Sequence, residues 1–352
     1  DKPDWIDAKA RYREFLAATW RKLTASLGHH AVISGNFGYH AERELAAALE
    51  VIGVPFVVLQ KENLRPPGQA RQDEVRNSTR RGPFGGRMIL QYNEVERQIE
   101  LRSGVVTLAR TKIVGMPRMD RLHQWRLDNA ARPVQGQRQV LFFLFGLKSG
   151  IPALPRKSSP ADKLPPEIEN AAWKEMQDLC IGAMVELARS APSLRVIIKT
   201  KGNKSSIALM ASKFSGTGGL PANFEVVVGG DPFTLLVDST VICGFNSTAL
   251  LEAIAANKPV VVPAFAEATR PEMLPYLINL EGAVEYAPSP EALVTILRET
   301  AEAEKMVNRG RELSSGQRAV LEKWTGNTDG CAGARVRAAL LDILAAKGKE
   351  SV

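Results

Sequence analysis

A compact strand–helix–strand pattern between residues 241 and 263 constrains the fold more than any other segment of this chain. The apolar run 241–243 stops at a Gly-Phe pair, and Asn246-Ser247-Thr248 then leads into an Ala/Leu/Ile-rich stretch that ends before Pro259. A second apolar run follows at once. Neighbouring parallel strands need a long crossover connection, usually a helix, whereas antiparallel strands can be joined by a short turn. Two buried strands that are joined by a helix are therefore expected to run parallel. The segment therefore predicts a βαβ unit within an α/β sheet.

The polar residues of this unit gather where the first strand ends and the helix begins. The unpaired N–H groups of a helix amino end, together with the hydroxyls of Ser247 and Thr248, favour an anion such as phosphate. The same residues could serve only as a helix N-cap. Taken by itself, the segment fits both interpretations.

Strands alternate with helices through the rest of the chain, on both sides of a polar stretch with Pro133 and Gly136 that we interpret as a linker. A length of 352 residues favours two domains. We therefore predict an α/β fold with two Rossmann-like doubly wound domains facing a cleft. Residues 1–130 form the first domain, residues 131–330 the second, and residues 331–352 a C-terminal helix that packs back at the domain junction.

Composition narrows the function classes. The three cysteines are far apart and lack metal-like spacing, which fits a reducing compartment, and no run approaches the length of a transmembrane helix. A net charge of +8 and a pI near 9.4 favour anionic partners. Nucleic acid is disfavoured, because aromatic residues make up only 6% and no nucleic-acid-binding module is apparent. The start at Asp1 leaves room for flanking domains.

Polar residues follow two predicted strands of the first half. Because the carboxyl ends of parallel strands meet at one edge of a sheet, we expect these residues to line one cleft. Glu62 is the first candidate to take the proton of an acceptor hydroxyl, and an ion pair with Lys61 is an equally good interpretation. His40 and Glu42 are second candidates, and His40 could instead hold the donor's carboxylate or phosphate. Candidates for the acceptor side or the cleft are Asn36, Gly38, Lys61, Arg65 and Arg118.

The stretch from Arg65 to Arg87 carries many arginines between Pro and Gly residues. We predict a long polar loop that either binds an anionic acceptor or is simply solvated.

In the second half, a leaving phosphate would need fixed positive charge or N–H donors. The candidates for donor binding are Lys199, Lys201, Gly230, Asp231, Pro232, Asn246, Ser247 and Thr248. A solvated turn is an equally good interpretation of the two lysines. No Asp-x-Asp lies at a strand end, so we expect no metal site and no cofactor besides a nucleotide-sugar substrate.

These motifs resemble those of GT-B glycosyltransferases of the bacterial surface-carbohydrate and capsule type, and the chain is similar to Kdo transferases that use CMP-Kdo. The likeness rests on residues 238–253 with Lys258-Pro259-Val260, on Gly229-Gly230-Asp231-Pro232, on Gly115-Met116-Pro117-Arg118-Met119-Asp120 and on residues 59–65. Two departures stand out. Lys199-Thr200-Lys201-Gly202 replaces a Lys-x-His-Pro run, and Asn63-Leu64 follows Glu62 where the acidic motif has an acid and Gly.

The resemblance implies a metal-independent glycosyltransferase that passes a sugar, with Kdo from CMP-Kdo as one option, to a surface polysaccharide or lipid-linked glycan. The first domain would then bind the acceptor and the second the nucleotide sugar. The expected location is the cytoplasm, with peripheral contact to the inner membrane as an option. A polyol-phosphate transferase using CDP-glycerol and a non-catalytic glycan- or nucleotide-binding domain are the alternatives.

Overall fold

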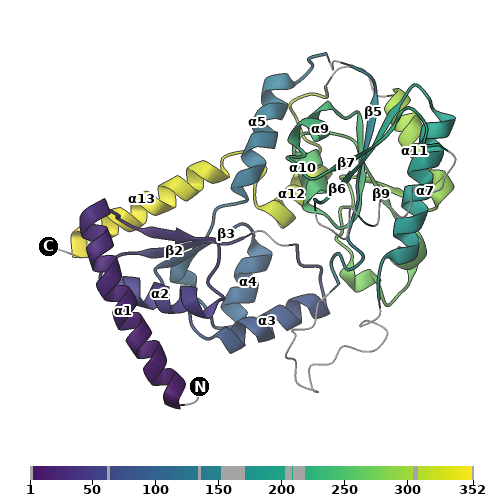
Figure 1. Ribbon diagram of the computed structural model, residues 1–352. Helices are drawn as coiled ribbons and strands as arrows, with labels where there is room; N and C mark the ends of the chain where they lie inside the picture. The colour runs from purple at the N-terminus through teal and green to yellow at the C-terminus, as the bar shows by residue number, and fades with distance from the viewer. Residues whose placement is uncertain are drawn as a thin grey trace. The chain divides into compact units, whose positions relative to one another are not determined.

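A computed structural model describes residues 3–61, 64–133, 136–151, 171–202, 208, 219–303 and 308–350. The chain forms two compact units. The first comprises Asp1–Asn63, Arg71–Asp120 and Glu322–Val352, and the second comprises Leu64–Ala70 and Arg121–Leu321. Each unit is built around one parallel sheet with helices (Figure 1). The predicted α/β class is confirmed.

The first unit holds a four-stranded sheet in the order β1-β2-β3-β4, with all described pairs parallel. Its strands are β1 (Val32–Ser34), β2 (Phe56–Leu59), β3 (Met88–Gln91) and β4 (Thr111–Ile113). Its helices are α1 (Pro3–Leu27), α2 (His40–Val51), α3 (Gln69–Arg81), α4 (Glu94–Arg102) and α13 (Ala332–Glu350), with the short 3-10 helices η1 (Leu108–Arg110) and η2 (Pro117–Met119).

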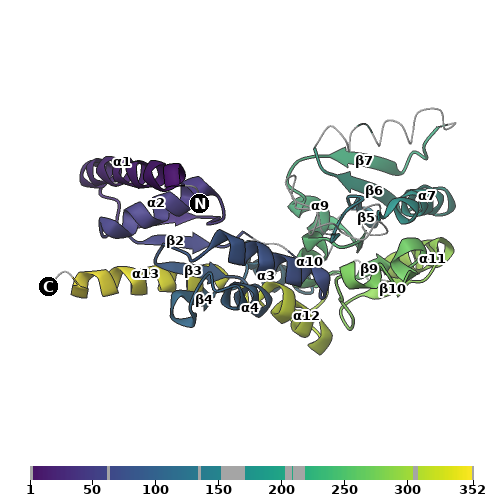
Figure 2. The same ribbon diagram turned by 90° about the horizontal axis from the view of Figure 1, so that it is seen from below.

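Side chains of the central strands alternate between two cores. Phe56 and Val58 of β2 pack with α2 residues such as Leu49, whereas Val57 packs with Ile343 of α13. This period-two alternation is what a strand covered on both faces requires. Figure 2 accordingly shows α1 and α2 on one side of the sheet and α13 on the other. The last helix, α13, is therefore part of the first unit.

One prediction for the first unit is wrong: the polar stretch after Arg65 is not one long loop. Helix α3 occupies residues 69–81 of it. Oppositely charged side chains meet at helical spacing, as in the ion pairs of Arg76 with Asp73 and of Arg81 with Glu74. Such pairs stabilise a helix that has almost no apolar face. Apolar periodicity, on which the prediction relied, could not detect it.

The second unit holds a six-stranded parallel sheet in the order β10-β9-β8-β5-β6-β7. Its strands are β5 (Gln139–Phe143), β6 (Arg195–Thr200), β7 (Phe224–Val228), β8 (Val241–Gly244), β9 (Val260–Pro263) and β10 (Glu285–Ala287). The chain starts in the middle, runs to one edge, and returns to run to the other. This is the doubly wound Rossmann order, with its switch point between β5 and β8.

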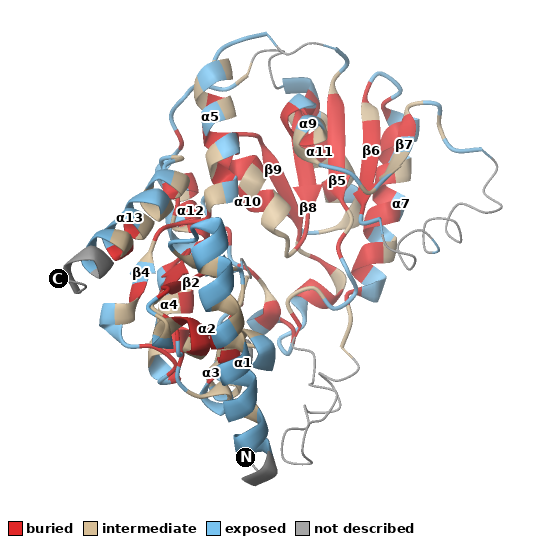
Figure 3. Ribbon diagram, turned by 60° about the vertical axis from the view of Figure 1, so that its left-hand side comes forward, coloured by how far each residue is buried: buried red, intermediate tan, exposed pale blue. Residues whose placement is uncertain are grey.

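Helices cover both faces of the second sheet. Helices α7 (Lys174–Ser190) and α11 (Pro290–Ala303) lie on one face, and α9 (Phe233–Asp238) and α10 (Thr248–Ala255) on the other (Figures 1 and 2). The four inner strands β5, β6, β8 and β9 are almost wholly buried, whereas the edge strands β7 and β10 are partly exposed (Figure 3). The predicted β8–α10–β9 unit is confirmed. Helix α5 (Asp120–Asn129) precedes the predicted linker residues Pro133 and Gly136, and α12 (Ser315–Thr325) precedes α13.

Candidate functional site

A pocket of about 490 Å³ lies in the first unit, where strands β1 and β2 end. Its walls come from the loop after β1, the first turn of α2, the loop after β2, and η2. Four of the predicted site residues line it, and these are Asn36, Glu42, Lys61 and Arg118. The pocket thus brings together residues that follow two predicted strands and a residue of the run from Gly115 to Asp120.

Glu42 places a carboxylate in the pocket wall. Its Oε1 accepts a hydrogen bond of 3.2 Å from Ser34 Oγ, at the end of β1. Its Oε2 is buried and has no hydrogen-bond partner among the described residues. Leaving a buried acceptor unpaired costs about 1–3 kcal/mol, and more for a charged group. A buried, unpaired acceptor of this kind in a pocket wall makes Glu42 a candidate functional residue.

Gln60 adds a second acceptor to the same wall. Its Nε2 donates to Glu96 Oε2 at 3.1 Å, and Glu96 is almost fully buried. This bond fixes the amide so that Oε1 is the remaining polar atom, and Oε1 also has no partner in the described part of the chain. Asn93 holds Glu96 in place, because its Oδ1 accepts from the Glu96 N–H at 2.9 Å. Two residues that line the pocket, Glu42 and Gln60, thus each carry a buried acceptor atom without a partner among the described residues.

Cations stand at the same pocket. The side chains of Lys61 and Arg118 are exposed, and the Lys61 N–H donates to Gly35 O at 3.2 Å, which joins the loops after β1 and β2. Asn36 has a structural role, since its Oδ1 accepts from the Gly38 N–H at 2.7 Å and shapes the turn. His40 is exposed at the start of α2 and does not line the pocket.

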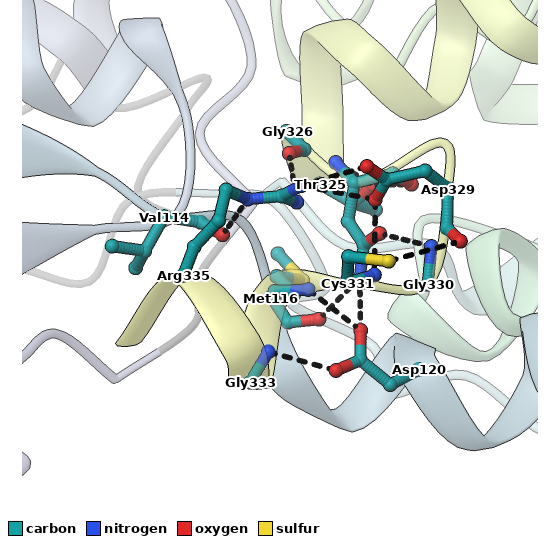
Figure 4. A network of polar contacts seen from close by, with 12 residues as sticks. Val114, Met116, Asp120, Thr325, Gly326, Asp329, Gly330, Cys331, Gly333 and Arg335 are labelled. Carbon is teal, nitrogen blue, oxygen red and sulfur yellow. Dashed lines mark hydrogen bonds and ion pairs between the residues drawn. The ribbon is translucent and has the colours of Figure 1, made fainter. Parts of the chain in front are cut away.

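The run from Gly115 to Asp120 contains Arg118 and ends in a carboxylate that is bonded to the start of α13 (Figure 4). Asp120 Oδ1 accepts from the Ala332 N–H at 3.0 Å and Oδ2 from the Gly333 N–H at 2.8 Å. A carboxylate at these N–H groups caps α13 and complements its dipole. Met119 is buried, so η2 is held from two sides while the intervening Arg118 stays at the pocket. Sequence reasoning assigned no role to Asp120.

A second anchor joins the same segment to α13. The Arg335 Nε donates to Val114 O at 2.8 Å, and its Nη1 bonds both oxygens of Asp329 at 3.0 and 2.8 Å (Figure 4). Burial by itself would raise the pKa of Asp329, but the bonds from Arg335 and from the Cys331 N–H outweigh it and lower that pKa. Gly115 has φ +84°, and a Cβ there would lie 2.6 Å from Gly326 O, so only glycine fits.

In the second unit, Asn246 lies directly after β8, beside the switch point. Its amide donates to Tyr276 O at 2.9 Å and to Ser149 O at 3.3 Å, and its Oδ1 accepts from the Ile278 N–H at 3.0 Å. The residue has φ +44°, a conformation that Asn tolerates better than most residues. The side chain thus clamps three loops together. Its bonds go to the protein's own backbone.

Ser247 is the N-cap of α10. Its Oγ accepts from the Ala249 N–H at 3.2 Å, and its backbone is extended, as expected for a cap. The hydroxyl keeps its own proton to donate to a ligand. Thr248 begins the helix. Next to it, a largely apolar pocket of about 340 Å³ is lined by Asn246, Leu250, Tyr286 and their neighbours.

The remaining predicted donor residues of the second unit differ in exposure. Lys199 is 7% exposed, its Nζ donates to Thr200 O at 3.1 Å, and burial lowers the pKa of its ammonium. Lys201 is exposed at the strand end. Asp231 accepts from Arg121 Nη1 at 2.8 Å and from the Phe233 N–H at 3.0 Å, and the Arg121 bond is the main reason that its pKa is lowered.

The last predicted residues are placed as follows. Gly230 has φ +78° and lets the chain turn, and Pro232 is the N-cap residue of α9. Arg65 belongs to segment 64–70 of the second unit and does not line the first-unit pocket. Glu62 lies outside the described residues. Within the described ranges, no group of three or more His, Cys, Asp or Glu side chains could hold a metal ion.

No protein-family model and no curated protein matches this sequence. Solved structures do match it. A UDP-N-acetylglucosamine 2-epimerase matches with a TM-score of 0.53 at 11% identity, over 95% of this chain and 77% of that one. A Listeria monocytogenes protein provisionally assigned to the same activity matches with a TM-score of 0.52 at 12% identity, over 94% of this chain and 79% of that one. The fold is GT-B.

The wall teichoic acid polymerase TagF matches less well, with a TM-score of 0.47 at 10% identity, over 84% of this chain and 69% of that one. At 11–12% identity, the likeness to the two structures with TM-scores above 0.5 establishes the GT-B architecture of two Rossmann-like units and nothing about chemistry. Function must be argued from the site.

Proposed function

We propose that this protein is a nucleotide-sugar-dependent glycosyltransferase whose acceptor hydroxyl binds in the first-unit pocket, with Glu42 as the general base. The observation that carries the proposal is the buried Glu42 Oε2 without a partner, at the carboxyl edge of a Rossmann-like sheet. A carboxylate in that state is suited to take a proton from a bound hydroxyl. Gln60 Oε1 would accept from a neighbouring hydroxyl and orient the sugar.

The reaction follows from these roles. Glu42 takes the acceptor's hydroxyl proton, the hydroxyl oxygen bonds to the donor's anomeric carbon, and the bond from that carbon to the phosphate oxygen breaks. The nucleotide leaves with the electron pair. N–H groups at the start of α10, the Ser247 hydroxyl and the Lys199 ammonium would stabilise the phosphate charge. The neighbouring 340 Å³ pocket is large enough for part of the donor.

The finer assignment rests on the resemblance alone. It makes CMP-Kdo the first donor to try and a surface polysaccharide or lipid-linked glycan the acceptor. Calorimetry of the protein with CMP, CDP, UDP and GDP tests the donor side. We expect one of the cytidine nucleotides to bind best. If none of the four binds, the proposal is wrong.

A nucleotide-sugar 2-epimerase is the second candidate, favoured by the two structures with TM-scores above 0.5. Such an enzyme keeps sugar and nucleotide joined in its product, whereas a transferase releases the nucleotide. Proton NMR of the protein with UDP-N-acetylglucosamine separates the two. A growing signal of the 2-epimer would replace the transferase proposal. A product that contains the donor's phosphate, found by mass spectrometry, would instead indicate polyol-phosphate transfer from CDP-glycerol.

A further inference from the structure

One face of helix α1 packs against the first unit, and another face is exposed to solvent. Ala17 is buried, Trp20 packs against the core cluster that contains Leu49, and Arg13 forms an ion pair with Glu44 of α2. Helix α1 lies against α2 of the same unit (Figure 2).

The second face is apolar and exposed. Trp5, Tyr12, Leu16, Leu23 and Leu27 follow one another at spacings of seven and four residues, which are close to two turns and one turn of helix. They therefore fall within about 60° of one another around the helix axis and form one stripe. Exposed fractions are 59% for Trp5, 41% for Tyr12, 37% for Leu23 and 62% for Leu27, and Phe15 beside the stripe is 63% exposed. Figure 3 shows α1 exposed along most of its length. Large apolar side chains in one continuous stripe indicate a binding surface.

The charges around this stripe indicate its partner. At 100° per residue, Lys9 falls at one edge of the stripe, and Arg11 and Lys22 lie beside Phe15 beyond its other edge. Asp7, Glu14 and Arg21 fall on the opposite side of the helix. The chain as a whole carries a charge of +8. A second copy of the same face would bring these cations near their own counterparts. An anionic surface would complement them instead.

We propose that this stripe of α1 docks in the plane of an anionic phospholipid membrane. Phe15 and the leucines would enter the boundary between headgroups and acyl chains, and Trp5 and Tyr12 suit that boundary because each joins an apolar ring to a polar group. Lys9, Arg11 and Lys22 would meet lipid phosphates. None of the described helices is long and apolar enough to cross a bilayer, so this is attachment to the surface. The proposal stands independently of the proposed function.

The test is cosedimentation of the full chain with vesicles of mixed phosphatidylcholine and phosphatidylglycerol. We expect binding to the mixed vesicles, weakened by salt, and little binding to phosphatidylcholine alone. The double variant Phe15→Glu, Leu23→Glu should weaken binding at least about tenfold. Lys22→Gln should weaken it roughly fivefold, in keeping with one basic contact.

Val51→Glu is the matched control, because Val51 is 76% exposed on α2 of the same unit and outside the stripe. It should bind vesicles as the wild type does, and circular dichroism checks that every variant is folded. The proposal is overturned if the wild type ignores the mixed vesicles, if it binds both vesicle types alike, or if Val51→Glu loses binding as fully as the double variant. Light scattering that shows a dimer broken by Phe15→Glu would assign the stripe to a second copy instead.

Discussion

The polar strand ends of the two units are built in opposite ways. In the second unit, the Asn246 side chain forms hydrogen bonds with three backbone groups. Ser247 caps α10, and the Asp231 carboxylate accepts hydrogen bonds from Arg121 and from the Phe233 N–H. In the first unit, Glu42 Oε2 and Gln60 Oε1 are buried at the pocket without a partner among the described residues. These second-unit side chains hold loops in place, whereas each of the two first-unit side chains keeps one acceptor atom without a protein partner in the described part of the chain. The second unit has a comparable atom in Thr200 Oγ1, at the end of β6.

The comparison separates two uses of the same residue types. A polar side chain satisfied by its own protein stabilises the fold and leaves ligand binding to backbone N–H groups, as at the start of α10. A buried polar side chain without a partner lowers stability, and at the wall of a pocket it is a candidate for binding a ligand. Mutations at the two kinds of position should therefore separate stability from activity.

Glu42→Gln gives the largest expected effect. Under the proposed function, turnover falls about 10²–10⁴-fold, because the amide cannot take a proton. The free energy of unfolding should change by less than about 1 kcal/mol, since one unpaired buried group replaces another. Nucleotide release from the donor in the presence of acceptor measures the first quantity, and urea unfolding the second.

His40→Gln is the control for that variant, because His40 is two residues away on α2 but exposed and outside the pocket lining. It should change turnover by less than about threefold, well below the effect of one general acid–base group. Equal losses in the two variants would contradict the assignment of Glu42 as the base.

Asn246→Ala should show the opposite pattern. It removes three hydrogen bonds and puts Ala at φ +44°, so we expect a loss of about 3 kcal/mol in the free energy of unfolding. Asn246→Gly should lose about 1 kcal/mol less, because glycine accepts the backbone conformation. Urea denaturation of both variants measures this. Weaker nucleotide binding without destabilisation would instead make Asn246 a direct ligand.

Substitutions of Ser247 test whether one residue both caps α10 and binds the donor phosphate. Ser247→Ala removes the cap of α10 and should cost about 1 kcal/mol. Ser247→Asp keeps a good cap but puts a negative charge where the donor phosphate is proposed to lie. Stability should be retained while nucleotide affinity falls at least about tenfold, from the like charge at a helix amino end. Calorimetry that finds unchanged affinity for Ser247→Asp would move the phosphate elsewhere.

The sequence predicted the frame of the molecule well, because apolar strands and turn residues are local signals. The β8–α10–β9 unit and the alternation of strands and helices were found this way. Helix α3 was not predicted, because ion pairs rather than an apolar face stabilise it. Gln60 and Asp120 escaped for a different reason. Their partners, Glu96 and the N–H groups of α13, are distant in sequence, so only the fold reveals them.

Substitution of Lys199 should give the smallest change in the free energy of unfolding, and its pH dependence tests the effect of burial on this lysine. Burial lowers the pKa of its ammonium below the ordinary 10.5, so the folded state pays for keeping it charged at neutral pH. Lys199→Met should therefore raise the free energy of unfolding near pH 7. As pH rises through the lowered pKa toward 10.5, the wild type gains stability, because the unfolded chain binds more protons there, and the advantage of the variant shrinks.

Lys201→Met, at the exposed neighbour, should leave stability unchanged at every pH. If Lys199 also holds the donor phosphate, Lys199→Met will be the more stable protein and the weaker nucleotide binder, whereas a purely structural lysine would give the first effect alone. Thermal unfolding across pH and calorimetry with the best-binding nucleotide measure the two. If Lys199→Met is stabilised and keeps full affinity for the nucleotide, Lys199 has only a structural role, as expected for Asn246.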